Sequence, residues 1–190
     1  MFQSWTKKEA GKFILCFILF FVLVLLTELP GYLSPLYWAL HPVCAAFLAA
    51  GPVTCVLSMK RGFGSAAALP LLWFIVMKLM GELGMPLMWI GALVMIVVAE
   101  VVHMALGCDN LRSIRVSAVL AALTTSTIIW PLYFQTKEFV TRAADEMNQT
   151  YASALSSYGK PVMFILMIVL SVIAATVSER IAERIMKIEK

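Results

Sequence analysis

The chain has 190 residues, of which 62% are hydrophobic and 14% are charged, and its mean hydropathy is +0.90. Soluble domains are about half apolar and about a quarter charged, so this composition excludes a soluble globular protein and indicates a polytopic membrane protein. The net charge of +4 gives no argument for nucleic acid binding.

Six stretches are apolar enough and long enough to cross a bilayer as helices, which takes about 20 residues each. In chain order they cover residues 13–29, 35–59, 66–83, 87–107, 114–135 and 161–182. Lys78, Gly81 and Glu82 interrupt the end of the third stretch. We therefore expect an all-α integral membrane protein, a compact six-transmembrane-helix bundle that forms a single membrane domain over residues 1–190.

Lysine and arginine are distributed unevenly among the expected loops. Eleven lie in the two termini and in the second and fourth connections, whereas three lie in or beside the long connection before the last span. Cytoplasmic loops carry the excess of these residues, so we expect both termini to be cytoplasmic. The connections at residues 29–35, 81–86 and 136–160 then lie on the outer side.

The longest outer connection, residues 136–160, has the periodicity of an amphipathic helix. Its apolar residues recur at three- and four-residue steps: Val140, Ala143, Ala144, Met147, Tyr151, Ala154, Leu155 and Tyr158. Charged residues such as Glu138, Arg142 and Asp145 take the other face. We expect an extra amphipathic helix that either rests at the membrane interface or covers an opening, with a solvated connector as the alternative.

The second apolar stretch carries polar and aromatic residues close to its outer end. His41 lies about 9 Å below that end at 1.5 Å per residue. Pro42 falls in the first two turns, where a missing backbone donor is tolerated. Ionisable groups inside a membrane are costly and usually face the bundle interior or a wet cavity. We therefore expect an outward-facing pocket at this depth, and its candidate residues are Glu28, Tyr37, Trp38, His41, Lys78, Glu82, Met85, Trp89, Trp130 and Tyr133.

Each candidate also has a structural interpretation. Trp89, Trp130 and Tyr133 lie where an aromatic belt anchors a protein at the membrane interface. Lys78 and Glu82 are four residues apart and can neutralise each other on one helix. For His41, a hydrogen-bonded structural role is the alternative to facing a ligand.

A second polar pair, Glu100 and His103, lies deeper in the fourth stretch and shares one helix face. Four roles remain open for this pair: a proton relay, an inter-helix hydrogen bond, a contact with a partner subunit, or a carboxylate–imidazole pair whose two side chains bond each other. The HExxH motif of metalloproteases is absent from the sequence, and two histidines leave little from which to build a metal centre. We expect no enzymatic activity.

Three motifs give the chain a family resemblance: LSPLYWALHP at residues 33–42, MKRGFG at 59–64 and the basic ERIMK at 183–187. With the six spans, inside termini and short basic inner loops, the chain resembles the substrate-capture (S) components of energy-coupling factor (ECF) transporters. It is most similar to the Trep_Strep group, also called the MptD family, over nearly its full length.

This resemblance implies a multi-pass protein of the bacterial plasma membrane that captures a micronutrient from outside. The ligand is either a vitamin-like molecule or a haem or metal chelate held by His41 and a methionine such as Met85. The implied partners are an EcfT-like membrane coupling subunit and two cytoplasmic ATPases, which agrees with the absence of a GxxxxGK[ST] phosphate loop from the sequence. A non-transporting membrane scaffold or accessory subunit is the alternative.

Small residues indicate where helices approach closely in lipid. Many S components carry an AxxxA pattern on their first helix that packs against the coupling subunit, and this sequence has no such pair there after Ala10. The resemblance therefore leaves the docking face to another helix. We expect it on the second stretch, at the ridge formed by Ala45, Ala46, Ala49 and Ala50.

Overall fold

The computed structural model describes residues 6–59 and 62–187, and all regular structure within these ranges is helical. In chain order the helices are α1 (Lys7–Leu33), α2 (Pro35–Met59), α3 (Ala68–Met80), α4 (Pro86–Ala105), α5 (Leu111–Leu123), η1 (Thr124–Ile129), α6 (Trp130–Phe134), α7 (Thr136–Glu146), α8 (Gln149–Ser156) and α9 (Pro161–Met186). The expectation of an all-α membrane protein is confirmed. Lys60, Arg61 and Lys190, which contribute to the expected excess of inner basic residues, lie outside the described ranges.

Five helical segments of the described chain are long and apolar enough to span a membrane: Lys7–Leu33, Pro35–Met59, Pro86–Ala105, Leu111–Phe134 and Pro161–Met186. The expected third span is only the 13-residue helix α3. At 1.5 Å per residue α3 is about 20 Å long, short of the roughly 30 Å hydrocarbon core. Gly81 ends it in the left-handed conformation, with φ of 85°. The count of six full spans is therefore not supported.

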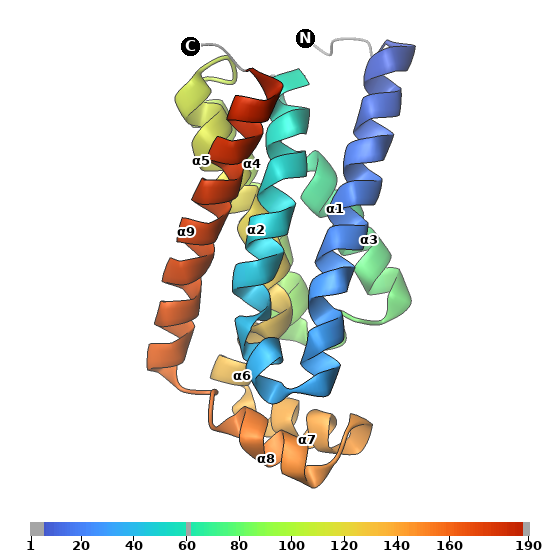
Figure 1. Cartoon of the computed structure of the whole chain (residues 1–190), viewed down its shortest axis with the longest axis vertical. Coiled ribbons are helices and arrows are strands. Elements are labelled where there is room, and N and C mark those ends of the chain that lie inside the picture. Colours follow the sequence, from blue (N-terminus) through green and yellow to red (C-terminus); the bar gives the residue numbers. More distant parts are fainter. Residues whose placement is uncertain (1–5, 60–61, 188–190) are drawn as a thin grey trace.

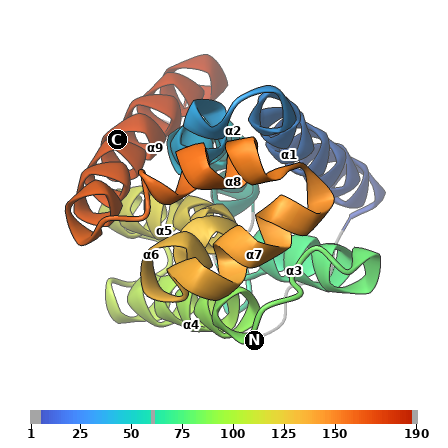
Figure 2. The ribbon, with the colours of Figure 1, turned by 90° about the horizontal axis from the view of Figure 1, so that it is seen from below.

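Helix α2 is the central helix of the bundle and lies against α1, α5 and α9 (Figures 1 and 2). Small side chains allow this close approach. Ala45, Ala46, Ala49 and Ala50 are all fully buried at 0% exposure. The ridge expected to dock a partner is therefore not exposed in this structure, because its residues pack against neighbouring helices of the same chain.

The fifth span is continuous in space but changes its helical geometry halfway. The six residues Thr124–Ile129 form a 3-10 helix with four buried hydroxyl residues in succession. Thr125, Ser126 and Thr127 each donate a side-chain hydrogen bond to the carbonyl three residues earlier. Such local bonds compete with α-helical geometry and satisfy hydroxyls that have no access to water. The α-helix resumes as α6 at Trp130.

The two ends of the bundle differ. The start of α1 and the end of α9 lie together at the upper end in Figure 1, whereas α7 and α8 fold across the lower end, as Figure 2 shows from below. The expected single helix at 136–160 is broken at Met147, and Asn148 starts α8 by accepting a hydrogen bond from the Tyr151 amide at 2.8 Å. We call this helical hairpin, residues 136–156, the cap.

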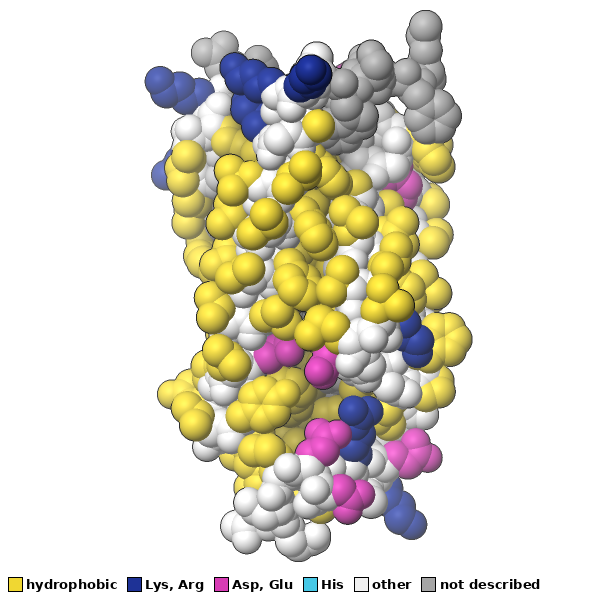
Figure 3. Space-filling model, turned by 90° about the vertical axis from the view of Figure 1, so that its right-hand side faces the viewer, with side chains coloured by type: hydrophobic (Ala, Val, Ile, Leu, Met, Phe, Trp, Pro, Cys, Tyr) yellow, Lys and Arg dark blue, Asp and Glu magenta, His cyan; other side chains and the backbone are white. Residues whose placement is uncertain are grey.

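The surface between these ends is apolar. Large hydrophobic side chains are exposed along α1, α4 and α9. On the face that Figure 3 shows, hydrophobic side chains form a broad band, with Lys and Arg gathered above it. Below the band the surface carries both acidic and basic side chains. An exposed apolar surface of this extent is what lipid contact requires.

Candidate functional site

A cavity of about 80 Å³ lies beneath the cap, where the end of α1, the start of α2 and the turn between α3 and α4 meet. One water needs about 10–15 Å³, so there is space for several waters or for a small organic group. The lining residues are Glu28, Gly31, Tyr32, Trp38, Glu82, Met88, Ile128, Phe139, Arg142, Ala143, Glu146, Met147, Tyr151 and Leu155. In Figure 3 a recess lies between acidic side chains near the lower end of this face.

Glu28 is the most deeply buried acidic group of the lining. It sits near the end of α1 with only 6% of its surface exposed, and no described residue forms a hydrogen bond with its Oε1 atom. Nε2 of His41 on α2 lies 3.9 Å from this oxygen, which is too long for a hydrogen bond. Leaving such a group unsatisfied costs about 1–3 kcal/mol, so the carboxyl group is available to a ligand or to water.

Aromatic rings form the wall beside Glu28. The Trp38 ring packs directly on Gly31, where a larger residue would collide with it. Its centroid lies 6.2 Å from that of Tyr32 and 5.6 Å from that of His41. Glycine at position 31 thus allows the indole to pack closely against α1, where it also lines the cavity.

The cap is fastened to the bundle at two points. The Tyr151 hydroxyl on α8 donates a hydrogen bond to the Gly31 carbonyl, and burial raises the pKa of this phenol above its usual value. On α7, the Arg142 guanidinium packs on Gly84 in the turn between α3 and α4, and its Nε lies 2.6 Å from Glu146 Oε1. These contacts hold the cap over the cavity.

The expected site residues divide into two groups. Glu28, Trp38 and Glu82 line the cavity together, and His41 lies directly behind Glu28 without lining it. Lys78 is not paired with Glu82 among the described contacts. Its ammonium donates instead to the Leu83 carbonyl at 3.1 Å.

The remaining expected residues lie elsewhere. The Lys78 ammonium stands 5.4 Å above the centroid of the Trp89 ring, outside the cavity lining. Trp130 and Tyr133 pack against Phe164 of α9, at centroid distances of 6.0 and 5.2 Å. Tyr37 is 52% exposed, and Met85 is buried at the start of α4. These six side chains do not belong to the lining in this structure.

The cap supplies seven lining residues that were not named as site candidates: Phe139, Arg142, Ala143, Glu146, Met147, Tyr151 and Leu155. The sequence signal for them is the amphipathic periodicity of residues 136–160, whose apolar face includes Ala143, Met147 and Tyr151. That pattern identifies a buried face but not what it covers.

Glu100 and His103 have separate structural partners. Glu100 accepts backbone hydrogen bonds from Gly64 at 2.7 Å and from Ala66 and Ala67 at 3.1 Å, so it caps the amino end of α3. His103 Nδ1 lies 2.9 Å from the Ser113 hydroxyl of α5. The pair therefore ties α4 to α3 and α5.

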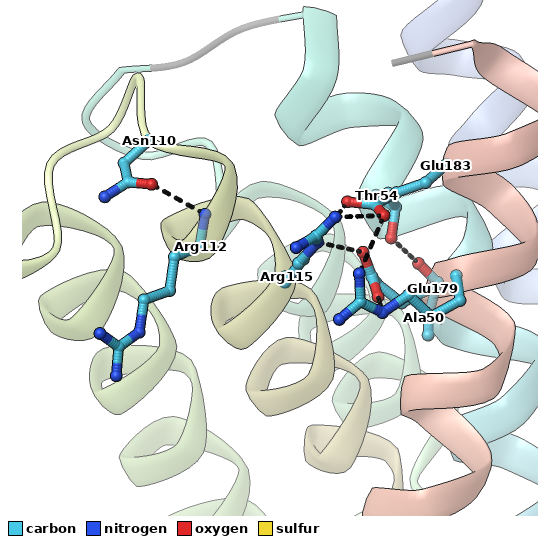
Figure 4. Close-up of polar contacts among 8 residues, drawn as sticks. Ala50, Thr54, Asn110, Arg112, Arg115, Glu179 and Glu183 are labelled. Carbon is cyan, nitrogen blue, oxygen red and sulfur yellow. Dashed lines mark hydrogen bonds and ion pairs between the residues drawn. The ribbon is translucent and has the colours of Figure 1, made fainter. Parts of the chain in front are cut away.

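An ion-pair network that was not predicted lies at the opposite end of the bundle (Figure 4). The Arg115 guanidinium on α5 donates to both carboxylate oxygens of Glu183 on α9, at 2.7 and 3.0 Å. Glu179, which is 1% exposed, lies 3.9 Å from Arg115 and 3.5 Å from Arg180. Arg115 is 64 residues from Glu179 and 68 from Glu183 along the chain, so no local spacing rule reveals this link between α5 and α9.

No group of three or more His, Cys, Asp or Glu side chains in the described parts of the chain is placed to hold a metal ion. The chain matches a family described as hypothetical bacterial integral membrane proteins (Trep_Strep) over residues 9–189. No curated protein and no solved structure matches it.

Proposed function

The chain belongs to the Trep_Strep family of bacterial integral membrane proteins, and we propose that it is the substrate-binding S component of an energy-coupling factor importer. In this role it captures a micronutrient in the cavity beneath the cap. The observation that carries the proposal is the cavity itself, where the buried Glu28 presents an unbonded carboxyl oxygen beside Trp38 and beneath a helical hairpin. Polar groups converging on a largely apolar cavity are typical of small-molecule sites.

The proposed orientation places the cap outside a bacterial plasma membrane and both termini in the cytoplasm. Two observations support it. The start of α1 and the end of α9 lie at the same end of the bundle, opposite the cap. Lys and Arg gather at that end, as the positive-inside rule requires of a cytoplasmic face. The cavity then opens toward the outside, where a scarce nutrient is found.

In this proposal the protein binds and releases its ligand without chemical change. The energy for inward release comes from two cytoplasmic ATPases, acting through an EcfT-like membrane coupling subunit. Because the four alanines of α2 are buried, that subunit contacts another surface. The exposed apolar faces of α1 and α9 are available for this contact within the membrane.

Of the two ligand classes, the geometry favours a vitamin-like organic molecule over haem. The residues expected to ligate haem are His41 and a methionine such as Met85, since histidine and methionine side chains can hold haem iron. His41 lies behind Glu28, and Met85 is buried outside the lining. A small organic molecule needs neither residue to reach the cavity surface.

Mass spectrometry of the protein purified from its native membrane tests the proposal. We expect a co-purifying small molecule that is retained by a Glu138→Gln control on the exposed side of the cap and lost from a Trp38→Ala variant. A second experiment, affinity capture through a tag on this chain, is expected to recover an EcfT-like protein together with ATPases. Empty preparations and no such partners would leave the scaffold role instead.

A further inference from the structure

We propose that the ligand of this cavity carries a positively charged group, an amine or quaternary ammonium, attached to a small apolar part. This inference rests on the proposed function, because it names the chemical class of the molecule that the cavity captures. Three observations support it: the charges of the lining residues, the Glu28 carboxyl oxygen that has no hydrogen-bond partner, and the aromatic wall.

The acidic groups of the lining outnumber its basic groups. Three carboxyl groups, those of Glu28, Glu82 and Glu146, face the cavity, and Arg142 is the one basic side chain among the described lining residues. Carboxylates that share a small site repel each other when ionised. A bound cation removes that repulsion, whereas a bound anion increases it.

The basic groups nearest the cavity have other partners. The Arg142 Nε lies 2.6 Å from Glu146 on the same helix, one turn away, so the positive charge of Arg142 is offset by one of the three acids. Lys78 donates to the Leu83 carbonyl and stands over the Trp89 ring. Among the contacts of the described residues, neither forms an ion pair with Glu28 or Glu82, which leaves these two acids for a ligand.

The buried carboxyl group of Glu28 points to a ligand independently of the numbers of acidic and basic lining residues. Its side chain is more than nine-tenths buried, lines the cavity, and has an Oε1 atom without a hydrogen-bond partner among the described residues. A buried acceptor of this kind is satisfied by a donor that enters the cavity. An ammonium group supplies both the donor and the opposite charge.

The aromatic wall suits an organic cation better than a metal ion. Trp38, Tyr32 and Tyr151 contribute rings to the same small cavity as the two acids. The faces of such rings attract ammonium groups, with tryptophan the strongest, whereas divalent metals prefer oxygen and nitrogen ligands. The rings also provide apolar surface for the uncharged part of the molecule.

Probes that are similar in shape but differ in charge test the inference on the full chain in lipid nanodiscs. One set compares choline with its neutral isostere 3,3-dimethyl-1-butanol, and the other compares phenethylamine with 2-phenylethanol and phenylacetate. Binding is followed by tryptophan fluorescence and by the unfolding temperature. We expect the cation of each set to bind about tenfold or more tightly than its neutral partner.

Two isosteric variants assign this preference to the cavity. Glu28→Gln and Glu82→Gln are each expected to reduce the preference for the cation severalfold, and Glu82, which is only half-buried, provides the test if Glu28→Gln does not fold. Glu138→Gln removes an acid from the exposed side of the cap and is expected to change nothing. Equal binding of cationic and neutral probes, no binding of any cation, or a preference unaffected by both cavity variants would overturn the inference.

The molecule extracted from the same preparation separates this inference from the proposed function. A neutral or anionic molecule that is lost in Trp38→Ala would overturn the cationic class and leave the capture function standing. If no molecule is extracted and no probe binds, both are overturned.

Discussion

Glu28 Oε1 and His41 Nε2 lie 3.9 Å apart across the interface between α1 and α2, and neither atom has a hydrogen-bond partner among the described residues. Both side chains are buried, at 6% and 1% exposure. Because Glu28 lines the cavity and His41 stands behind it, the histidine supports the acid and the Trp38 ring rather than facing the ligand.

A His41→Ala substitution is therefore expected to weaken ligand binding through displacement of Glu28 and Trp38, by about 1–3 kcal/mol. The affinity for the co-purified molecule measures this loss. His103→Ala is the matched control, since His103 is equally buried but bonds Ser113 at the other end of the bundle. If His103→Ala lowers affinity as much as His41→Ala, the effect is one of general stability and the role of His41 is refuted.

Gly31→Ala is expected to displace the Trp38 ring, because the added methyl group would overlap the indole. Overpacking of this kind typically costs about 1–3 kcal/mol, more than the roughly 0.5–1 kcal/mol gained by alanine in a helix. Thermal unfolding and the tryptophan emission spectrum report the change. Gly11→Ala on the same helix meets no atom within 4 Å and is expected to be neutral or stabilising. An unshifted spectrum in Gly31→Ala would show that the Trp38 contact is not as described.

Tyr151→Phe removes the hydroxyl that fastens α8 to the Gly31 carbonyl. The loss of one such bond costs about 0.5–1.5 kcal/mol, so we expect faster amide exchange in α8 and a severalfold faster ligand release. Tyr37→Phe, at an exposed ring on α2, should leave both unchanged. Unaltered exchange in the Tyr151 variant would mean that the cap is held by other contacts.

Arg115→Met leaves Glu183 without its bidentate partner and removes one of two arginines near the buried Glu179. Breaking a largely buried pair from one side costs on the order of 2 kcal/mol or more, and we expect a lower unfolding temperature with ligand affinity intact. The control is Arg112→Met, whose exposed guanidinium points away from the network in Figure 4. Equal stability of the two variants would show that the network does not hold α5 to α9.

The apolar spans were predictable because the hydrocarbon core sets their length and composition. The predicted limits 35–59 coincide with those of α2, and the predicted 161–182 lies within α9. The short α3 was not predicted, because hydropathy counts the apolar residues 66–83 without recording where the helix begins. Glu100, 36 residues after Gly64, fixes that beginning by capping the segment before Ala68.

Only the depth of the site in the membrane could be predicted from the sequence. Periodicity and polarity placed Glu28, Trp38 and Glu82 near one end, and these three do meet at the cavity. Which way a helix faces depends on its neighbours, so Trp130 and Tyr133 at the same depth instead pack on Phe164. The small-residue ridge of α2 correctly indicated close helix contact, and this contact is with other helices of the same chain.

The most direct test of the central claim, that the cavity beneath the cap holds a small molecule, is native mass spectrometry of the full-length protein released from nanodiscs. We predict an added mass that vanishes in Trp38→Ala and persists in Glu138→Gln. Spectra showing only the bare chain for the unaltered protein, or an added mass that Trp38→Ala retains, would contradict the claim.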